Sequence, residues 1–278
     1  MGTEKRARQK SNRQARLQAA LEEQKKAKQR RTYLRFGGIV AAAMAFFLVF
    51  WLLNRGDSEK VVATDSTATS GSVTTKSGLK LVAPPLGKTL SGETPCPKAD
   101  GSEQRVTTFA APPPMCIDAS KTYKAKITTS IGELTITFDA KKAPKTVNNF
   151  VVLSRYHYYD GVPFHRIVPG FVAQAGDGNP KTELGTGGPG YTFADELPKS
   201  VDEYVAGSVA MANSGANTNG SQFFFWYGPT KLPSPAYALF GQVTEGFDTV
   251  GKELLALGTE SQKPSKIVTI DKIEISES

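Results

Sequence analysis

Histidine and cysteine are scarce in this 278-residue chain, which contains two of each. Protein sites for zinc and similar metals are built from clusters of these side chains. The histidines, His157 and His165, have no cysteine near them at a ligand spacing. We therefore expect no metal site, and nothing else in the sequence indicates a cofactor.

An excess of positive charge is missing from most of the chain. Residues 1–35 contain twelve Lys or Arg against three Glu, whereas the remainder contains twenty-two basic and twenty-three acidic residues. Such a charge run can bind nucleic acid. Its position directly before an apolar run favours membrane topology instead, because positive residues stay on the cytoplasmic side. We expect no nucleic-acid partner.

The apolar run covers residues 36–53 (FGGIVAAAMAFFLVFWLL), eighteen uncharged residues that nearly reach the minimum length for a bilayer-spanning helix. A cleaved signal peptide is the alternative. No A-x-A-like cleavage site follows Leu53, which argues against it. We expect a single-pass anchor in the cell membrane, with the N-terminus cytoplasmic and the C-terminal part extracytoplasmic.

The sequence predicts five segments: a basic leader (1–35), the membrane helix (36–53), a Ser/Thr/Pro-rich linker (54–94), a cysteine-containing extension (95–120) and a folded domain (121–278). The linker has too little apolar surface to fold alone. Cys96 and Cys116 lie beyond the span, where an oxidising compartment would permit them to pair. We predict a disulfide worth about 3 kcal/mol, and two free thiols are the alternative.

Short strands dominate the pattern of the folded domain. Residues 124–138 predict two strands about Ile131-Gly132, and residues 267–275 predict a closing strand. Helical spacing occurs at 143–153, headed by Pro144, and at 246–257. This pattern alone indicates a mostly-β domain.

Two long blocks carry a family resemblance: 164–177 (FHRIVPGFVAQAGD) and 211–225 (MANSGANTNGSQFFF), with 185–191 (GTGGPGY) between them. They resemble the cyclophilins, which are peptidyl-prolyl cis-trans isomerases. The tract 185–190 also spells G-x-G-x-x-G, but Pro189 and an aromatic stretch follow where a dinucleotide site needs a helix. We expect a flexible loop beside a peptide groove.

The resemblance covers about the last 155 residues, the size of one domain. It implies a closed eight-stranded antiparallel β-barrel with two capping helices, here preceded by a single transmembrane helix. The membrane segment and the Ser/Thr linker suggest a bacterial protein anchored on the outer face of the membrane.

Arg166 is the predicted catalytic residue. Rotation about a prolyl peptide bond breaks the amide resonance, so the proline nitrogen regains a lone pair that a donor can bond only near the transition state. A guanidinium keeps its proton and presents several fixed donors. Gln174 lies eight residues further on and is expected to hold the substrate carbonyl or to orient Arg166.

Apolar side chains are expected to form a slot for the proline ring: Phe171, Val172, Phe224 and Leu232. The resemblance adds the backbone of Asn213 as a grip on the peptide before the proline, with Ala212, Gln222, Tyr237 and Phe240 as the remaining wall. Strand alternation separates Phe223 from Phe224, so one of the two belongs to the core. His165 is expected to pack, since isomerisation moves no proton.

Three positions depart from the better-known cyclophilins. Leu232 replaces a tryptophan, Tyr237 replaces a histidine and Val172 replaces a methionine. The first change puts cyclosporin binding in doubt. We expect a peptidyl-prolyl isomerase that acts on proline-containing extracytoplasmic polypeptides and assists their folding. A non-catalytic chaperone or scaffold that binds the same segments is the alternative.

Overall fold

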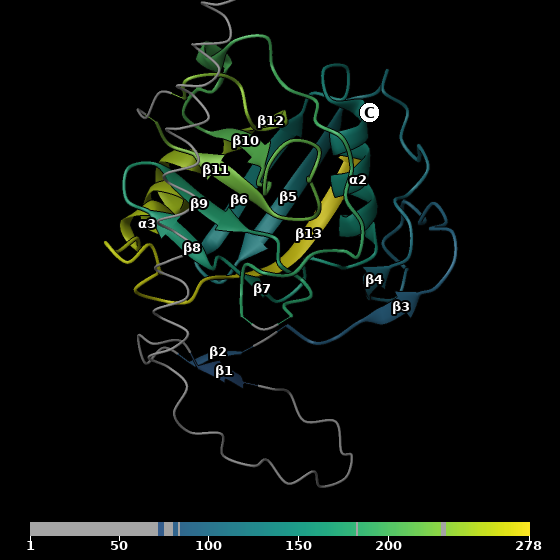
Figure 1. Ribbon diagram of the computed structural model, residues 1–278, viewed down its shortest axis with the longest axis horizontal. Helices are drawn as coiled ribbons and strands as arrows, with labels where there is room; N and C mark the ends of the chain where they lie inside the picture. Colours follow the sequence, from purple (N-terminus) through teal and green to yellow (C-terminus); the bar gives the residue numbers. More distant parts are fainter. Residues whose placement is uncertain (1–71, 75–79, 83, 182, 229–231) are drawn as a thin grey trace, which may run out of the picture. The chain divides into compact units, whose positions relative to one another are not determined.

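The computed structural model describes residues 72–74, 80–82, 84–181, 183–228 and 232–278 (Figure 1). All described residues belong to one unit of the chain, residues 68–278. The predicted leader and membrane span lie outside the described residues, so the anchor stays a prediction. Within the described ranges, no helix combines the length and apolar character that a bilayer crossing needs.

A nine-stranded antiparallel sheet forms the centre of this unit (Figure 1). Each neighbouring pair in it is antiparallel, as expected for a chain of short strands joined by turns. The strands in spatial order are β7 (Val162–Pro163), β13 (Thr269–Glu277), β5 (Tyr123–Thr129), β6 (Gly132–Phe138), β12 (Leu239–Glu245), β10 (Ser208–Met211), β11 (Phe223–Trp226), β9 (Val172–Ala175) and β8 (Arg166–Val168).

The sheet is not a closed barrel of eight strands, so that part of the prediction is wrong. Its end strands, β7 and β8, are consecutive in the chain and are joined by Phe164 and His165 instead of by a ladder. The Phe164 N–H donates to the Val268 carbonyl (2.9 Å) and the His165 N–H donates to the Gln174 carbonyl (3.1 Å). The chain itself therefore crosses between the two ends of the curled sheet, and Arg166 is the first residue of the strand reached by this crossing.

The predicted hairpin around Ile131-Gly132 is confirmed. β5 and β6 pair from Thr129 with Gly132 onward, and buried residues alternate along β5. The closing strand is confirmed in type but runs two residues later than expected. A bulge between Ile270 and Lys272 breaks its alternation, so Ile270 and Ile273 are both buried.

The helix α2 (Pro144–Arg155) agrees with the prediction and packs on the sheet through its apolar face. Its N-cap, Ala143, offers no side-chain hydrogen bond. The carboxylate of Glu196 supplies the cap instead, since it accepts the N–H groups of Lys145 (3.1 Å) and Thr146 (2.8 Å). The second predicted helix is divided into a π-helical turn, η2 (Phe247–Gly251), and the short α3 (Lys252–Ala256).

Strands also lie N-terminal to the expected domain. β1 (Ser72–Thr74) pairs with β2 (Lys80–Val82), and β3 (Lys88–Leu90) pairs in parallel with β4 (Val106–Phe109). Cys96 and Cys116 are joined in a disulfide with a Cα–Cα distance of 5.4 Å, as predicted. We call residues 84–120 the strap. It includes the last part of the predicted linker, which is therefore ordered here.

Candidate active site

A second apolar cluster lies outside the main core, on the outward faces of β9, β10 and β11. Its buried members are Val172, Tyr204, Ala210, Phe224 and Trp226, and we call it the outer cluster. The strand β11 contributes side chains to both faces of the sheet, because successive side chains point to opposite faces. Phe223 and Phe225 belong to the main core, whereas Phe224 and Trp226 belong to the outer cluster.

Arg166 lies at the edge of this face, on β8, where it pairs in register with Gln174 of β9. Its Nη1 donates to the Gln174 side-chain oxygen (3.2 Å) and its Nε donates to the Gln262 side-chain oxygen (2.9 Å). Among the described residues no other hydrogen-bond acceptor is in contact with this guanidinium. Its remaining N–H groups are thus available to a ligand.

A chain of amide side chains continues from Arg166. Gln174 Nε2 donates to the Gln222 side-chain oxygen (2.9 Å), and Gln222 Nε2 donates to the carbonyls of Gly185 and Gly187 (3.0 Å each). Each amide accepts from one neighbour and donates to the next, so the order fixes the orientation of both glutamines. The chain ends on the Gly-rich tract that the sequence placed beside the groove.

The Gly-rich tract is folded around the buried carboxylate of Asp177. This side chain accepts the N–H groups of Gly185 (2.7 Å) and Gly187 (3.0 Å). Burial raises the pKa of Asp177, and these backbone hydrogen bonds oppose that rise. A Cβ at Gly187 would overlap the carboxylate and the Asn179 carbonyl, so only glycine fits there. These contacts define the shape of the tract, whereas its expected flexibility stays a prediction.

His165 precedes Arg166 and lies against Gly185. Burial, followed by the positive charge of Arg166, lowers the pKa of His165 from 6.5 to about 4. The imidazole is therefore neutral near pH 7. Its Nδ1 is buried and makes no hydrogen bond within the described part of the chain. This is the packing residue that the sequence predicted.

A pocket of about 300 Å³ adjoins the glutamine chain. Its lining includes Gln174 and Gln222, residues 185–189 and residues 212–214. The Asn213 side chain donates to the Ala236 carbonyl (2.9 Å), which holds this turn in place. Neither backbone group of Asn213 has a hydrogen-bond partner among the described residues, so both can bond water or a ligand.

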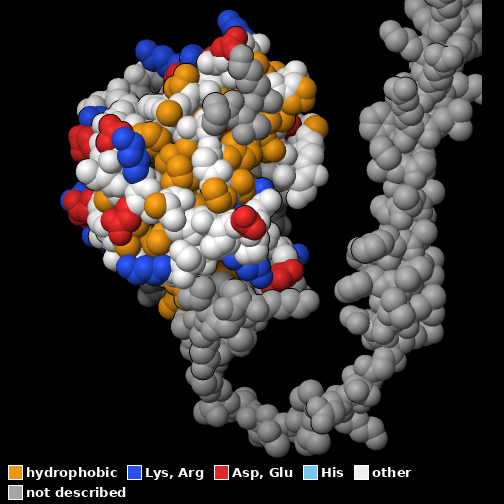
Figure 2. Space-filling view, turned by 90° about the vertical axis from the view of Figure 1, so that its left-hand side faces the viewer, with side chains coloured by type: hydrophobic (Ala, Val, Ile, Leu, Met, Phe, Trp, Pro, Cys, Tyr) orange, Lys and Arg blue, Asp and Glu red, His pale blue; other side chains and the backbone are white. Residues whose placement is uncertain are grey.

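Aromatic rings support the apolar surface beside Arg166. Phe171 meets Trp226 edge-on (4.7 Å between centroids), and Tyr237 meets Phe224 edge-on (5.1 Å). Leu232 packs against the same outer cluster. Figure 2 views the side that carries β8, β9 and α3 in Figure 1, and hydrophobic side chains gather across its middle.

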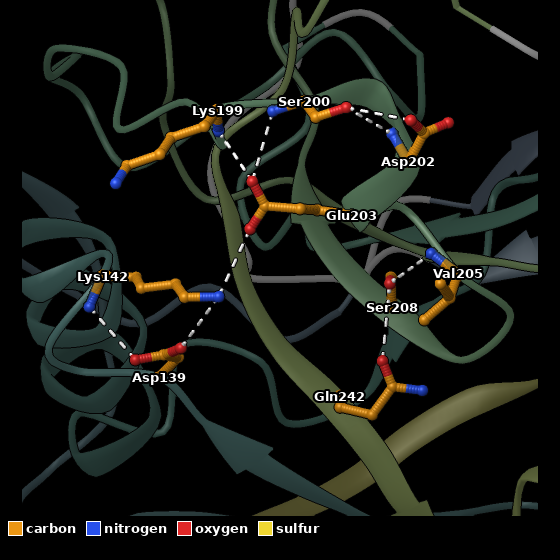
Figure 3. A network of polar contacts seen from close by, with 9 residues as sticks. All are labelled: Asp139, Lys142, Lys199, Ser200, Asp202, Glu203, Val205, Ser208 and Gln242. Carbon is orange, nitrogen blue, oxygen red and sulfur yellow. Dashed lines mark hydrogen bonds and ion pairs between the residues drawn. The ribbon is translucent and has the colours of Figure 1, made fainter.

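A polar network holds the turn η1 (Val201–Glu203), which directly precedes Tyr204 of the outer cluster (Figure 3). The Glu203 carboxylate accepts the N–H groups of Lys199 and Ser200 and pairs with the Lys142 ammonium at 3.3 Å. Tyr204 follows directly, stacks on Trp226 and donates its hydroxyl to the Tyr237 carbonyl (2.6 Å). The network thus helps to position the Tyr204 ring within the outer cluster.

The structure brings together nearly all of the predicted site residues. Arg166, Gln174 and Gln222 form the polar chain. The apolar residues gather in or against the outer cluster: Phe171, Val172, Ala212, Phe224, Leu232 and Tyr237. Phe240 is a correction, because it is fully buried in the main core and stacks on Phe138. Its neighbour Leu239 faces the outer cluster instead.

Sequence reasoning missed three residues of this site: Trp226, Tyr204 and Gln262. Trp226 could have been found, because it lies two positions after Phe224 and must share its face. No pattern identifies Gln262, which lies 96 positions from Arg166. It reaches the site because its carbonyl accepts the Ile167 N–H (2.9 Å), and its own backbone adopts φ of 62°.

Comparison with known proteins was made for the whole chain. The family model for cyclophilin type peptidyl-prolyl cis-trans isomerase/CLD matches residues 124–275. Peptidyl-prolyl cis-trans isomerase-like 1 of Gibberella zeae is 39% identical over 152 residues, which cover 54% of this chain and 92% of that protein. Peptidyl-prolyl cis-trans isomerase-like 3 of Homo sapiens is 38% identical over 151 residues, covering 53% and 92%.

Solved structures give the same picture. A crystal structure of a cyclophilin type peptidyl-prolyl cis-trans isomerase from Cryptosporidium parvum is similar to this chain with a TM-score of 0.51 and 32% sequence identity. The similarity covers 56% of this chain and 99% of that one. The Cryptosporidium protein has also been crystallised in the presence of the dipeptide Ala-Pro, and that structure has a TM-score of 0.50.

Proposed function

The chain belongs to the family of cyclophilin-type peptidyl-prolyl cis-trans isomerases, and from this membership we propose that it rotates X-Pro peptide bonds in extracytoplasmic proteins and so assists their folding. One observation carries the assignment of Arg166 as the catalytic residue. Its guanidinium is fixed by Gln174 and Gln262, keeps free donors, and adjoins an apolar surface suited to a proline ring.

The reaction needs a donor more than it needs covalent chemistry. A prolyl bond isomerises by itself, over a barrier of about 18–20 kcal/mol. When the bond twists, the imide nitrogen becomes pyramidal and exposes a lone pair. A free N–H of Arg166 donates to that lone pair in the twisted state only, which lowers the barrier selectively. No proton is transferred and no cofactor takes part.

The other groups hold the substrate while the bond turns. The unpaired backbone of Asn213 binds the peptide that precedes the proline. Phe171, Phe224 and Leu232 contact the ring methylenes of the proline, which are apolar and gain from leaving water. Neutral His165 adds no charge that would compete with Arg166. Each role uses a group that the folded chain already holds in place.

Replacement of the guanidinium tests this mechanism. We expect Arg166→Ala to lower kcat/KM for a prolyl tetrapeptide by two to three decades, since loss of one transition-state donor typically costs about 2.7–4 kcal/mol. Arg166→Lys should fall between the two, because it keeps the charge and loses the planar fork. Lys252→Ala, on the exposed face of α3, is the matched control.

Two outcomes would contradict the proposal. Equal activity of the wild type and Arg166→Ala would remove Arg166 from the mechanism. No isomerisation by either protein, with peptide binding retained, would favour the scaffold alternative.

The location is proposed from the sequence. The basic leader and the apolar run at residues 36–53 support a single-pass anchor with the isomerase domain outside the membrane. The relatives named above are eukaryotic and do not bear on a bacterial origin. The Ser/Thr/Pro-rich stretch after the span would give the domain reach toward proteins that emerge from the membrane.

A further inference from the structure

The strap lies outside the residues that match the family model, yet part of it is built into the folded domain. The match begins at residue 124. Within the strap, Val106 and Phe109 of β4 are 3% and 1% exposed and belong to the main core. The Val106 N–H donates to the carbonyl of Tyr156, just beyond α2 (3.0 Å). The strap is therefore an integral layer of this protein, added to the fold that the family shares.

β4 of the strap contacts the Gly-rich tract directly. The Phe109 N–H donates to the Pro189 carbonyl (2.8 Å), and the ring of Phe109 meets Tyr191 edge-on (6.2 Å). Gly190 adopts φ of 107°, and a Cβ there would overlap the Phe109 carbonyl. Backbone approach this close holds the tract at a fixed distance from β4.

A second contact joins the strap to Asn179, in the segment that precedes the Gly-rich tract. The Asn179 side chain donates a hydrogen bond from Nδ2 to Thr108 Oγ1 (3.0 Å). Asn179 follows Asp177, around which the tract is folded, and its own N–H bonds the Asp177 carboxylate (3.3 Å). The strap thus contacts Asn179, which precedes the Gly-rich tract, and Pro189 within the tract.

The Gly-rich tract that the strap contacts also accepts the last hydrogen bonds of the series that begins at Arg166. Gly185 and Gly187 accept from Gln222, Gln222 accepts from Gln174, and Gln174 accepts from Arg166. The same loop lines the pocket of about 300 Å³. A displacement of the loop by a fraction of an ångström would alter both the pocket width and the direction of the two amides.

A disulfide and several hydrogen bonds hold the strap in place, so it can act as a rigid support. The disulfide Cys96–Cys116 closes it. The Cys116 N–H donates to the Asn148 side-chain oxygen on α2 (2.7 Å), and Asn148 Nδ2 donates to the Pro114 carbonyl (2.8 Å). The Tyr156 hydroxyl donates to the Pro95 carbonyl (2.9 Å). These contacts tie both ends of the disulfide loop to the helix α2 and its C-terminal cap.

We propose that the strap is a positioning element of the active site, with Thr108 and Phe109 as its positioning residues. Through the Gly-rich loop it sets the width of the pocket and hence which residues flanking the proline are accepted. This inference rests on the proposed isomerase function and deepens it. The strap touches no substrate atom in this scheme, so it acts on substrate affinity and preference more than on the rotation itself.

Thr108 offers the sharpest test, because Thr108→Val keeps the side-chain shape and removes only the contact with Asn179. In the full-length protein, kcat and KM would be measured for two peptide series, varied at the residue before the proline and at the one before that. We expect KM to rise three- to tenfold with a changed order of preference, while kcat changes less than twofold. Thr108→Ser should restore wild-type values. Leu86→Ala, at an exposed strap residue, is the control.

A double variant, Cys96→Ser with Cys116→Ser, tests the support as a whole. We expect a lower melting temperature together with a shift in peptide preference in the direction seen for Thr108→Val. A lower melting temperature with unchanged preference, or an equal loss of kcat/KM for all peptides in Thr108→Val, would assign the strap a structural role only and overturn the proposal.

The two proposals fail in different ways. If the wild type is active, Arg166→Ala is impaired and Thr108→Val matches the wild type on both series, only the strap inference fails. If the wild type has no isomerase activity, the proposed function fails. The strap is then judged by the dissociation constants of the same peptides, and equal constants for wild type and Thr108→Val overturn it.

Discussion

Arg166 owes its position to two amides, one close to it in the sequence and one distant. Gln174 is its strand partner, whereas Gln262 arrives from the loop after α3. An arginine on an exposed strand edge would sample many rotamers, and restricting it costs up to about 2 kcal/mol of side-chain entropy. Here the two hydrogen bonds offset that loss of entropy during folding, so the guanidinium is already oriented before a substrate binds.

His165 makes a residue-scale prediction about pH. Its pKa is about 4 in the folded protein and 6.5 when unperturbed, so the unfolded chain binds the extra proton between these values. The contribution of neutral His165 to the free energy of unfolding is therefore fully present above pH 6.5, and it is lost as the pH drops toward 4. The loss is about 3 kcal/mol at pH 4. Urea unfolding at pH 7 and pH 4 measures it.

His165→Gln is the comparison for this experiment, since glutamine does not titrate. It should lack the acid-dependent loss that the wild type shows, while changes from other groups remain in both proteins. Asp177 acts in the opposite sense, because its raised pKa favours the folded state as the pH falls. An identical pH dependence for the two proteins would show that His165 is not buried as a neutral group.

At the scale of elements, the local patterns predicted the strands and helices well. The β5–β6 hairpin and α2 follow from short-range signals, namely alternation, a turn glycine and a proline at the first helical turn. The bulge in β13 was not predictable, since one inserted residue changes the phase of alternation without any mark in the sequence. The open sheet follows from which strands are adjacent, and this depends on long-range pairing.

The residues of the candidate site also differ in whether local sequence signals or long-range contacts identify them. Arg166 and Gln174 were found because polar side chains amid apolar neighbours are unusual for an ordinary strand, and Phe224 was found through the family resemblance. Gln262 and Tyr204 were missed because only the folded chain brings them near. Phe240 was misplaced because alternation in β12 puts it inside and Leu239 outside. Chemistry could be read from the sequence, whereas the supporting contacts required the structure.

The cap of α2 makes an element-scale prediction. Glu196 accepts two backbone N–H groups and the Thr146 hydroxyl (2.8 Å) at the start of a helix that has no cap of its own. Loss of an N-cap costs about 0.5–2 kcal/mol, and the negative charge adds a favourable interaction with the helix dipole. We expect Glu196→Ala to lower the free energy of unfolding by about 1–2 kcal/mol in urea titrations.

Glu196→Gln should lose less, because an amide oxygen still accepts a hydrogen bond without the charge. Glu260→Ala replaces an exposed carboxylate away from any helix start and is the control. If Glu196→Ala and Glu260→Ala have the same stability, the cap contributes nothing measurable.

At the scale of the whole molecule, the proposed location bears on the redox state of the strap disulfide. A cytosolic environment keeps most thiols reduced, whereas the extracytoplasmic side of a membrane allows disulfides to persist. The Cys96–Cys116 bond fastens the layer that supports the Gly-rich loop. If the anchor places the domain outside, the same topology that gives access to clients also keeps the strap closed.

Intact cells allow topology and disulfide to be tested together. A protease added from outside should release the domain by cutting the Ser/Thr-rich stretch after the predicted span, because a chain segment with little apolar surface offers cleavable sites. The released fragment should gain two mass units on reduction, as one disulfide becomes two thiols. Protection of the domain until the membrane is lysed would contradict the outward topology. Release of a fragment whose mass does not change on reduction would leave the topology standing and show that the strap is open in the cell.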